Sequence, residues 1–365
     1  MRVGKKMFNR NKNKKVFVGV SGGVDSAVAL ARLKKEGYQV FGVFIKTWSP
    51  DFINCSWPEE RREAIRVCAS LDVPFLDCDA EKEYEKEVAS YMIKEYSEGR
   101  TPNPDVMCNR QIKFGVFWKF AKERGADFIA TGHYAKKVKQ KDGSFDLLIG
   151  RDENKDQIYF LWMLNQDDLA HSLFPIGDLT KKKVRKIAKR YNLPNADKKD
   201  SQGVCFLGPL DIKKFLAHYI NQKEGQVLNE KGQVIGSHNG SVFFTLGERH
   251  GFVTNPSYDN KKPLYVIAKD IENNTIIVSE NKIIKDKDDA KLIKLTSCNW
   301  INKLPKINQK YKAQIRYHGE LYDCLLRQLE KEEIILELDN FVLADKGQSV
   351  VLYDKDICLG GGVII

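Results

Sequence analysis

Apolar runs and amphipathic stretches alternate through the first two hundred residues of the chain. Continuous apolar runs at 16–20 and 39–45 are typical of strands buried on both faces, and the run at 127–130 predicts a further strand. The stretches at 59–71 and 81–96 repeat apolar residues at the spacing of one helix face. This alternation predicts an α/β fold with a doubly wound parallel sheet.

The pattern changes after Gly225, where short alternating runs are separated by Gly, Asn and Asp. Runs at 242–245, 264–267 and 275–278 predict strands of one small module, and the runs from 291 to 353 predict a second. We expect both modules to be mostly β and barrel-like. The predicted organisation is a basic arm at 1–15, an α/β domain at 16–222, a central β module at 223–287 and a C-terminal β-barrel at 288–365.

Composition and net charge indicate what class of protein this is and what kind of partner it binds. The chain has 365 residues, 42% of them hydrophobic and 30% charged, which is typical of a globular protein with two or three domains. Its net charge of +11 favours a polyanionic partner, nucleic acid before a membrane, although a lysine-rich solvated surface would give the same value. Residues 1–15 are basic and rich in Asn. We interpret them as a disordered arm that touches RNA, with a targeting peptide as the alternative.

Cysteine usage points to the compartment. Eight cysteines without a secretory signal or a C-x-x-C pair argue against a disulfide scaffold, a zinc ribbon and a local iron–sulfur ligand set. We therefore predict no metal-binding residues. Because no apolar run is long enough to span a bilayer, we expect a protein of the reducing cytoplasm that does not bind a membrane.

The segment Ser21–Ser26, with the sequence SGGVDS, directly follows the first predicted strand and opens an amphipathic helix. Paired glycines can present successive backbone N–H groups to an anion, and the helix start adds its own amides and positive dipole end. An ordinary glycine-rich turn is the alternative. The segments 46–48 and 131–134 also follow predicted strands, so all three are expected at one sheet edge, where such folds bind ligands.

Two cysteines stand in unusual surroundings. Cys108 follows alternating prolines at 102 and 104, which predict a rigid extended loop over 101–109. Cys205 lies in a polar, Gly-containing stretch at 199–206. Both are candidate nucleophiles, although most cysteines are simply small buried hydrophobic residues. Asp105 is a candidate base, with a turn residue as the alternative.

Several longer motifs carry a resemblance to a known family. In chain order they are SGGVDS, TPNPDVMCN, ATGHY, KDQIYFL, LFPIGDL, KKDSQGVCF, TLGERHG, GQSVVLY and CLGGG. SGGVDS alone resembles the pyrophosphate loop of ATP pyrophosphatases, which adenylate their substrates. The whole series resembles the MnmA family of tRNA-specific 2-thiouridylases, and the resemblance runs from about Lys15 to Ile364.

This resemblance implies roles for particular residues of the chain. ATP would contact Gly19, Val20, Ser21, Gly22, Gly23, Val24, Asp25, Ser26, Ile45 and Gly132. The target uracil would contact Asn103, Pro104 and Asp105. The tRNA would contact His133, Lys155, Asp156, Gln157, Arg316, Tyr317 and Gln348. Cys108 would be the catalytic nucleophile and Cys205 the carrier of a persulfide.

The implied reaction is ATP-dependent 2-thiolation of the wobble uridine. ATP, with a Mg²⁺ ion bridging its phosphates and Asp25 as a candidate ligand, would adenylate the C2 oxygen of the base. Attack of Cys108 on the persulfide of Cys205 would release sulfur and leave a disulfide that a reductant resets.

The expected partners are the tRNAs for Lys, Glu and Gln and a persulfide donor, which is either a cysteine desulfurase or a sulfur-relay protein. We expect the chain to act as a monomer. Two other functions stay open, an adenylating enzyme such as a lysidine synthetase and a non-catalytic RNA-binding protein with a relic nucleotide site. An iron–sulfur cluster on Cys108, Cys205 and a non-cysteine ligand also stays open.

Overall fold

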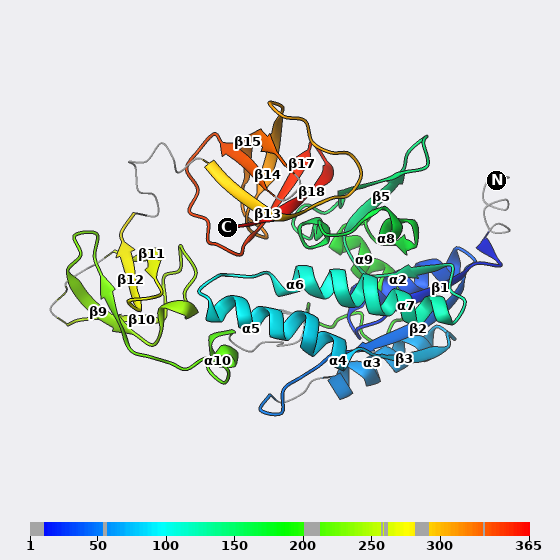
Figure 1. The fold of residues 1–365 in the computed structure, drawn as a ribbon. Coiled ribbons are helices and arrows are strands. Elements are labelled where there is room, and N and C mark those ends of the chain that lie inside the picture. The colour runs from blue at the N-terminus through cyan, green and yellow to red at the C-terminus, as the bar shows by residue number, and fades with distance from the viewer. Residues whose placement is uncertain are drawn as a thin grey trace.

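The computed structural model describes residues 11–53, 57–200, 212–256, 258, 262–281, 292–330 and 333–365. Figure 1 shows an α/β domain, a central module that contains β9 to β12, and a barrel that contains β13 to β18. Among the described residues, no helix has both the length and the apolar character needed to cross a membrane.

A five-stranded parallel sheet forms the core of the α/β domain, in the order β3-β2-β1-β4-β7. Its strands are β1 (Lys15–Gly19), β2 (Gln39–Lys46), β3 (Phe75–Asp79), β4 (Phe128–Ala130) and β7 (Ser172–Leu173). The apolar run of β1 is buried on both faces, as predicted, because Val16, Phe17 and Val18 are each at most 2% exposed. Lys15 lies in β1 and Lys14 pairs with Asp127, so the sheet begins inside the segment expected to be a disordered arm.

Helices cover both faces of this sheet. On the face of Val16 and Val18 lie α2 (Val24–Lys35), α3 (Trp57–Ser70) and α9 (Lys181–Arg190). On the face of Phe17 lie the π-helical η2 (Cys108–Val116) and α7 (Phe117–Glu123). Other helical elements before the central module, among the residues described, are α4 (Glu81–Tyr84), η1 (Glu85–Ala89), α5 (Ser90–Ser97), α6 (Pro104–Met107), η3 (Ile158–Leu161), α8 (Gln166–Ala170) and α10 (Ile212–Leu216).

The expected extended loop over 101–109 is wrong, because α6 begins at Pro104 and continues into η2 at Cys108. Proline is well tolerated at the first position of a helix, where its missing N–H has no partner to lose. Asn103 caps α6, since its side-chain oxygen accepts a hydrogen bond from the Val106 N–H at 3.3 Å. Cys108 therefore lies on a helix, one turn after its start.

The C-terminal barrel is closed, since β13 pairs with both β16 and β18. Its strands are β13 (Leu292–Trp300), β14 (Lys310–Gln314), β15 (Leu321–Leu329), β16 (Ile334–Leu338), β17 (Ser349–Asp354) and β18 (Ile357–Ile364). A hairpin of the α/β domain, β5 (Ala135–Lys139) and β6 (Phe145–Ile149), extends this sheet, because Leu147 and Leu148 pair with Cys358 and Ile357. The two parts of the chain thus share a sheet.

The central module contains a five-stranded sheet in the order β10-β9-β8-β12-β11. Its strands are β8 (Gly225–Leu228), β9 (Val234–His238), β10 (Phe252–Thr254), β11 (Tyr265–Asp270) and β12 (Thr275–Ser279). The strand expected at 242–245 is wrong, because a 3₁₀ turn, η4 (Ser241–Phe243), follows Gly240 at φ +135°. The predicted fold class is confirmed. The expected break near 286–290 lies outside the described residues, and the domain limits stay predictions.

Candidate nucleotide and RNA site

The glycine loop between β1 and α2 is held from two sides. Gly22 has φ +71°, and a Cβ on it would lie 2.8 Å from the carbonyl oxygen of Glu60 on α3. A side chain at this position would therefore be strained and would clash with backbone. Within the loop, the Ser26 hydroxyl accepts from Ser21 N at 3.3 Å and donates to the Gly23 carbonyl at 3.1 Å. The loop is thus shaped by its own serine and by α3.

The ends of β1, β2 and β4 meet at one edge of the sheet, as predicted, because the three strands are parallel neighbours. A Cβ on Gly132, just after β4, would lie 2.7 Å from the backbone nitrogen of Ser26. A Cβ on Gly19 would lie 3.6 Å from Cδ1 of Ile45. The start of α2 therefore packs directly against the segment after β4. The first backbone N–H groups of α2, which have no carbonyl partner within the helix, thus lie at this edge.

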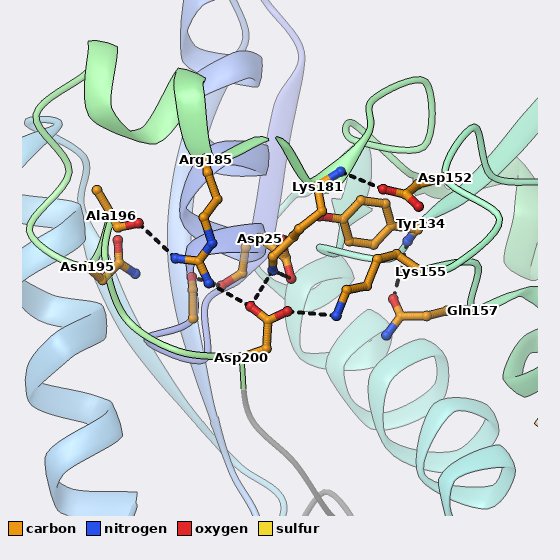
Figure 2. Close-up of polar contacts among 12 residues, drawn as sticks. Asp25, Tyr134, Asp152, Lys155, Gln157, Lys181, Arg185, Asn195, Ala196 and Asp200 are labelled. Atoms are coloured by element: carbon orange, nitrogen blue, oxygen red, sulfur yellow. Dashed lines mark hydrogen bonds and ion pairs between the residues drawn. The ribbon is translucent and has the colours of Figure 1, made fainter. Parts of the chain in front are cut away.

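Asp25, in the first turn of α2, accepts hydrogen bonds from two side chains (Figure 2). Lys181 Nζ lies 2.8 Å from Oδ2 and 2.9 Å from Oδ1, and the Tyr134 hydroxyl lies 2.7 Å from Oδ1. Burial, and then the Asp25 charge, raises the pKa of Tyr134, so the phenol keeps its proton and donates it. Lys181 thereby ties the start of α9 to the start of α2.

Three cations converge on the carboxylate of Asp200 beside this contact (Figure 2). Lys155 and Lys181 lie 2.7 Å from it through their Nζ atoms, and Arg185 lies 2.8 Å from it. Burial raises the pKa of Asp200, but the hydrogen bonds and the charges of Lys155 and Lys181 together outweigh this effect and lower the pKa to about 2. The site therefore gathers three positive side chains next to a helix start, an arrangement suited to a polyphosphate.

The predicted tRNA contacts Lys155, Asp156 and Gln157 are engaged within the chain. Lys155 pairs with Asp200, and Gln157 Oε1 accepts from the backbone N–H of Tyr134 at 3.2 Å. Asp156 accepts from the N–H groups of Gly150 and Ile158 at 2.7 and 3.3 Å, and burial raises its pKa to about 6. Each of these three predicted contacts therefore already has a partner within the chain.

Sequence reasoning missed four side chains of this cluster, namely Tyr134, Lys181, Arg185 and Asp200. Tyr134 and Asp200 lie inside the ATGHY and KKDSQGVCF motifs, and Lys181 follows LFPIGDL by two residues. For these three residues the available signal was a position in or beside a motif, whereas Arg185 lies in none of the motifs. Which carboxylate each cation meets depends on helix packing, which the motifs do not specify.

Cys108 is 1% exposed and packs among apolar side chains that include Ile112 and Phe215. The next residue, Asn109, donates through Nδ2 to the Phe160 carbonyl at 3.2 Å, which joins η2 to η3. Cys205 lies outside the described residues, so the structure does not address its pairing with Cys108. The α6–η2 helix therefore delivers the predicted nucleophile into a packed interior beside η3.

Two predicted tRNA contacts of the barrel lie near α6 and η3. The Tyr317 ring packs on Phe160 with centroids 4.3 Å apart. Burial, followed by the charges of Asp156 and Asp105, raises the pKa of Tyr317 to about 12. Arg316 donates to the Leu246 and Leu343 carbonyls at 2.7 and 3.1 Å. These residues come from the turn after β14 and bring the barrel next to the predicted base-contacting helix.

The other two predicted tRNA contacts are buried or engaged. His133 is 7% exposed, and its Nδ1 lies 2.7 Å from the Thr131 hydroxyl. Burial, with a smaller effect of Lys113, lowers the pKa of His133 well below its usual value, so the ring is neutral at pH 7. Gln348 Oε1 accepts from the Asp345 N–H at 2.9 Å. The predicted tRNA contacts thus do not form one exposed patch.

Comparison with known proteins covers all three parts of the chain. A family model described as the tRNA methyl transferase HUP domain matches residues 14–209, the tRNA methyl transferase PRC-barrel domain matches 213–280, and the Aminomethyltransferase beta-barrel domain matches 290–364. A protein of Aliarcobacter butzleri named tRNA-specific 2-thiouridylase MnmA 2 is 42% identical over 97% of this chain and 99% of its own length. The tRNA-specific 2-thiouridylase MnmA of Oceanobacillus iheyensis is 40% identical over 98% of this chain and 96% of its own length.

Proposed function

Because this chain belongs to the MnmA family of tRNA-specific 2-thiouridylases, we propose that it uses ATP to replace the C2 oxygen of the wobble uridine of tRNA with sulfur. The observation that carries the proposal is the glycine loop at the start of α2, with Lys155, Lys181 and Arg185 gathered beside it. A helix start flanked by three cations suits the triphosphate of an adenylating enzyme.

ATP occupies the edge where β1, β2 and β4 end. Its contacts are Gly19, Val20, Ser21, Gly22, Gly23, Val24, Asp25, Ser26, Ile45 and Gly132. The three cations hold the phosphates in competition with Asp25 and Asp200, and they stabilise the charge that develops on the departing pyrophosphate.

A Mg²⁺ ion fits this site only if phosphate oxygens of ATP supply some of its ligands. Among the residues that the structure describes, no three Asp, Glu, His or Cys side chains converge as a metal site. Mg²⁺ commonly takes one or two carboxylates and completes its shell with phosphate oxygens and water. Asp25 is the carboxylate in place for it, and the ion would neutralise charge on the phosphates.

The base binds at the start of α6. A uracil in the anticodon loop has to leave its stack to enter such a site, and Asn103, Pro104 and Asp105 receive it. Asp105 lies one helical turn before Cys108 on the same helix, and we assign it as the base that assists this thiol. His133, Lys155, Asp156, Gln157, Arg316, Tyr317 and Gln348 remain the proposed tRNA contacts, with rearrangement of those that are buried here.

The proposed chemistry has three balanced steps, followed by a reduction that restores the two cysteines. The C2 oxygen attacks the α-phosphate of ATP and pyrophosphate leaves. The Cys108 thiolate attacks the inner sulfur of the Cys205 persulfide, which forms a Cys108–Cys205 disulfide and releases hydrosulfide. Hydrosulfide adds to C2, AMP leaves with the former oxygen, and a two-electron dithiol reductant restores both cysteines.

The cellular setting stays part of the proposal. The net charge of +11 agrees with a tRNA partner, and we propose the tRNAs for Lys, Glu and Gln. We propose that a cysteine desulfurase or a sulfur-relay protein loads Cys205, and that the chain works as a monomer in the cytoplasm.

Nucleoside analysis of tRNA tests this function. Wobble-unmodified tRNA is incubated with the protein, ATP, Mg²⁺ and a persulfide-generating desulfurase, then digested and examined for 2-thiouridine by mass spectrometry. We expect 2-thiouridine with one AMP released per sulfur inserted, and its loss in Cys108→Ser and Cys205→Ser. Cys68→Ser is the matched control, because Cys68 is buried on α3 among apolar residues of the other sheet face.

Two results would contradict the proposal. AMP release without sulfur insertion, unchanged in both serine variants, would indicate another adenylating enzyme. Binding of tRNA with neither AMP nor 2-thiouridine would indicate a non-catalytic RNA-binding protein.

A further inference from the structure

A buried ion pair joins the central module to the barrel. Lys269 on β11 and Asp345 before β17 lie 2.7 Å apart, and their side chains are 6% and 4% exposed. Burying two charges carries a desolvation penalty that their attraction only partly offsets, so such a pair is a poor source of stability. We therefore look for the role of this ion pair in the segments that it holds together, and not in a gain of stability.

Every proton of the Lys269 ammonium has a partner. Besides Asp345, Nζ donates at 2.9 Å to the carbonyls of Gly99 and Phe244. The same Asp345 oxygen also accepts from the Thr101 hydroxyl at 2.8 Å and from the Leu246 N–H at 3.2 Å. The pair therefore binds residues from the α/β domain, the central module and the barrel at one point.

This point lies immediately before the proposed base-binding helix. Thr101 is two residues before Asn103, which caps α6, and its own N–H donates to the Lys346 carbonyl at 2.7 Å. Gly347 has φ +89°, and a Cβ on it would lie 3.0 Å from Thr101 N. The backbone that leads into α6 is thus clamped against the barrel, in the region of Figure 1 where α5 and α6 approach the central module.

The proposed tRNA contacts of the barrel flank the same point. Gln348 accepts from the Asp345 N–H at 2.9 Å, and Arg316 bonds the carbonyl of Leu246, whose N–H donates to Asp345. If tRNA binding shifts the barrel, these hydrogen bonds would transmit the displacement to Asp345, and the bond from Thr101 to Asp345 would transmit it to Thr101.

We propose that Thr101, Lys269 and Asp345 form a positioning junction, which sets α6 with Asn103 and Cys108 in register with the tRNA-binding face of the barrel. The inference rests on the proposed function of α6. None of the three residues touches the reacting atoms. They act by fixing where the base and the nucleophile meet, and small misplacements of reacting groups can lower a rate by about 100-fold.

Single-turnover thiolation at saturating ATP and tRNA tests the junction. Thr101→Val keeps the shape of the side chain but removes the hydroxyl that donates to Asp345, whereas Thr101→Ser keeps the hydroxyl. We expect Thr101→Val to lower the thiolation rate at least tenfold while the Kd values for ATP and tRNA change less than twofold. Thr101→Ser should restore the rate to within twofold of wild type.

A second variant separates positioning from loss of a buried lysine. Lys269→Met is compared with Lys137→Met on β5, because Lys137 bonds the carbonyls of Leu169 and Ser172 at 2.6 Å and shares no partner with the junction. Both variants are assayed at a temperature where circular dichroism shows them folded. We expect the thiolation rate to fall only in Lys269→Met.

The outcomes distinguish this inference from the function beneath it. If wild type thiolates tRNA and both Thr101→Val and Lys269→Met do so at the wild-type rate, the junction alone is overturned. An equal loss of rate in Lys137→Met and Lys269→Met would also overturn it, since a merely structural role predicts that result. A wild-type protein that makes no 2-thiouridine would overturn the proposed function and the junction with it.

Discussion

At the scale of single residues, Lys181 makes the contacts that join α2 to Asp200 in the proposed nucleotide site. It is the first residue of α9, its side chain is only 14% exposed, and it bonds both Asp25 and Asp200. A phosphate that enters the site would meet this ammonium while the carboxylates give way. We therefore expect the protein carboxylates and ATP to compete for Lys181.

Replacing Lys181 should weaken ATP binding. A charge-assisted hydrogen bond contributes about 1.5–3 kcal/mol, so we expect Lys181→Met to raise the Kd for ATP roughly 10- to 100-fold by isothermal titration calorimetry. Lys182→Met is the control, because Lys182 is the exposed neighbour on the same helix. Equal affinity in wild type and Lys181→Met would show that Lys181 does not bind the phosphates.

Asp200 should make stability depend on acid pH. Its pKa is about 2 in the folded chain and near 3.8 when unperturbed, so ionised Asp200 stabilises the fold above about pH 4. That contribution is lost as the pH falls through the folded pKa. We expect the advantage of wild type over Asp200→Asn in urea unfolding to shrink by about 1 kcal/mol between pH 6 and pH 3. An equal stability difference between wild type and Asp200→Asn at pH 6 and pH 3 would show that the three cations do not stabilise ionised Asp200 in the fold.

At the scale of elements, the glycine loop depends on α3 as much as on its own sequence. Gly22 combines a left-handed backbone with close approach to Glu60, whereas Gly232, in the turn between β8 and β9, has φ +76° with nothing within 4 Å of a Cβ. Both glycines have a positive φ, but only Gly22 has a neighbouring backbone atom where a Cβ would lie. Comparing them isolates what packing against α3 does for the loop.

Gly22→Ala should impair nucleotide binding, while Gly232→Ala should not. Both place an L-residue in the left-handed region, which costs about 1–2 kcal/mol. Only Gly22→Ala also pushes the loop away from the Glu60 carbonyl, so we expect its Kd for ATP to rise at least tenfold. Thermal melts of both variants provide the stability reference. Unchanged ATP affinity in Gly22→Ala would show that the position of the loop against α3 is not needed.

At the scale of the whole molecule, the hairpin β5–β6 makes the α/β domain and the barrel one packed unit. Leu147 is fully buried and belongs to the same core as Phe117, Val351 and Tyr353. That core draws on α7 and β17 as well as the hairpin, so the barrel is not an appended module on a linker. Movement of the barrel therefore reaches the α/β domain through packed side chains.

Leu147→Ala should destabilise both parts together. A Leu-to-Ala change in a core costs about 2–5 kcal/mol, whereas Val138→Ala on the same hairpin, at 43% exposure, should have little effect. We expect calorimetry to show one transition for the α/β domain and barrel, shifted to lower temperature only in Leu147→Ala. Separate transitions, with only one of them shifted, would contradict the shared core.

Local pattern predicted the parallel sheet and the edge at which β1, β2 and β4 end together, because apolar runs mark buried strands and the motifs directly follow those strands. It failed at 101–109, where two prolines suggested an extended loop and Pro104 instead opens a helix. It could not predict the pairing of β6 with β18 or the Lys269–Asp345 junction. Those contacts join residues far apart in the chain, and no local periodicity encodes which distant partner a residue meets.

The most direct test of the whole account follows the oxygen atom that leaves the base. Transfer RNA with ¹⁸O at C2 of the wobble uridine is thiolated in one turnover, and the AMP is analysed by mass spectrometry. Adenylation of the C2 oxygen predicts one ¹⁸O atom in AMP for each sulfur inserted into the tRNA. Thiolated tRNA accompanied by unlabelled AMP would contradict adenylation of the base and with it the central claim.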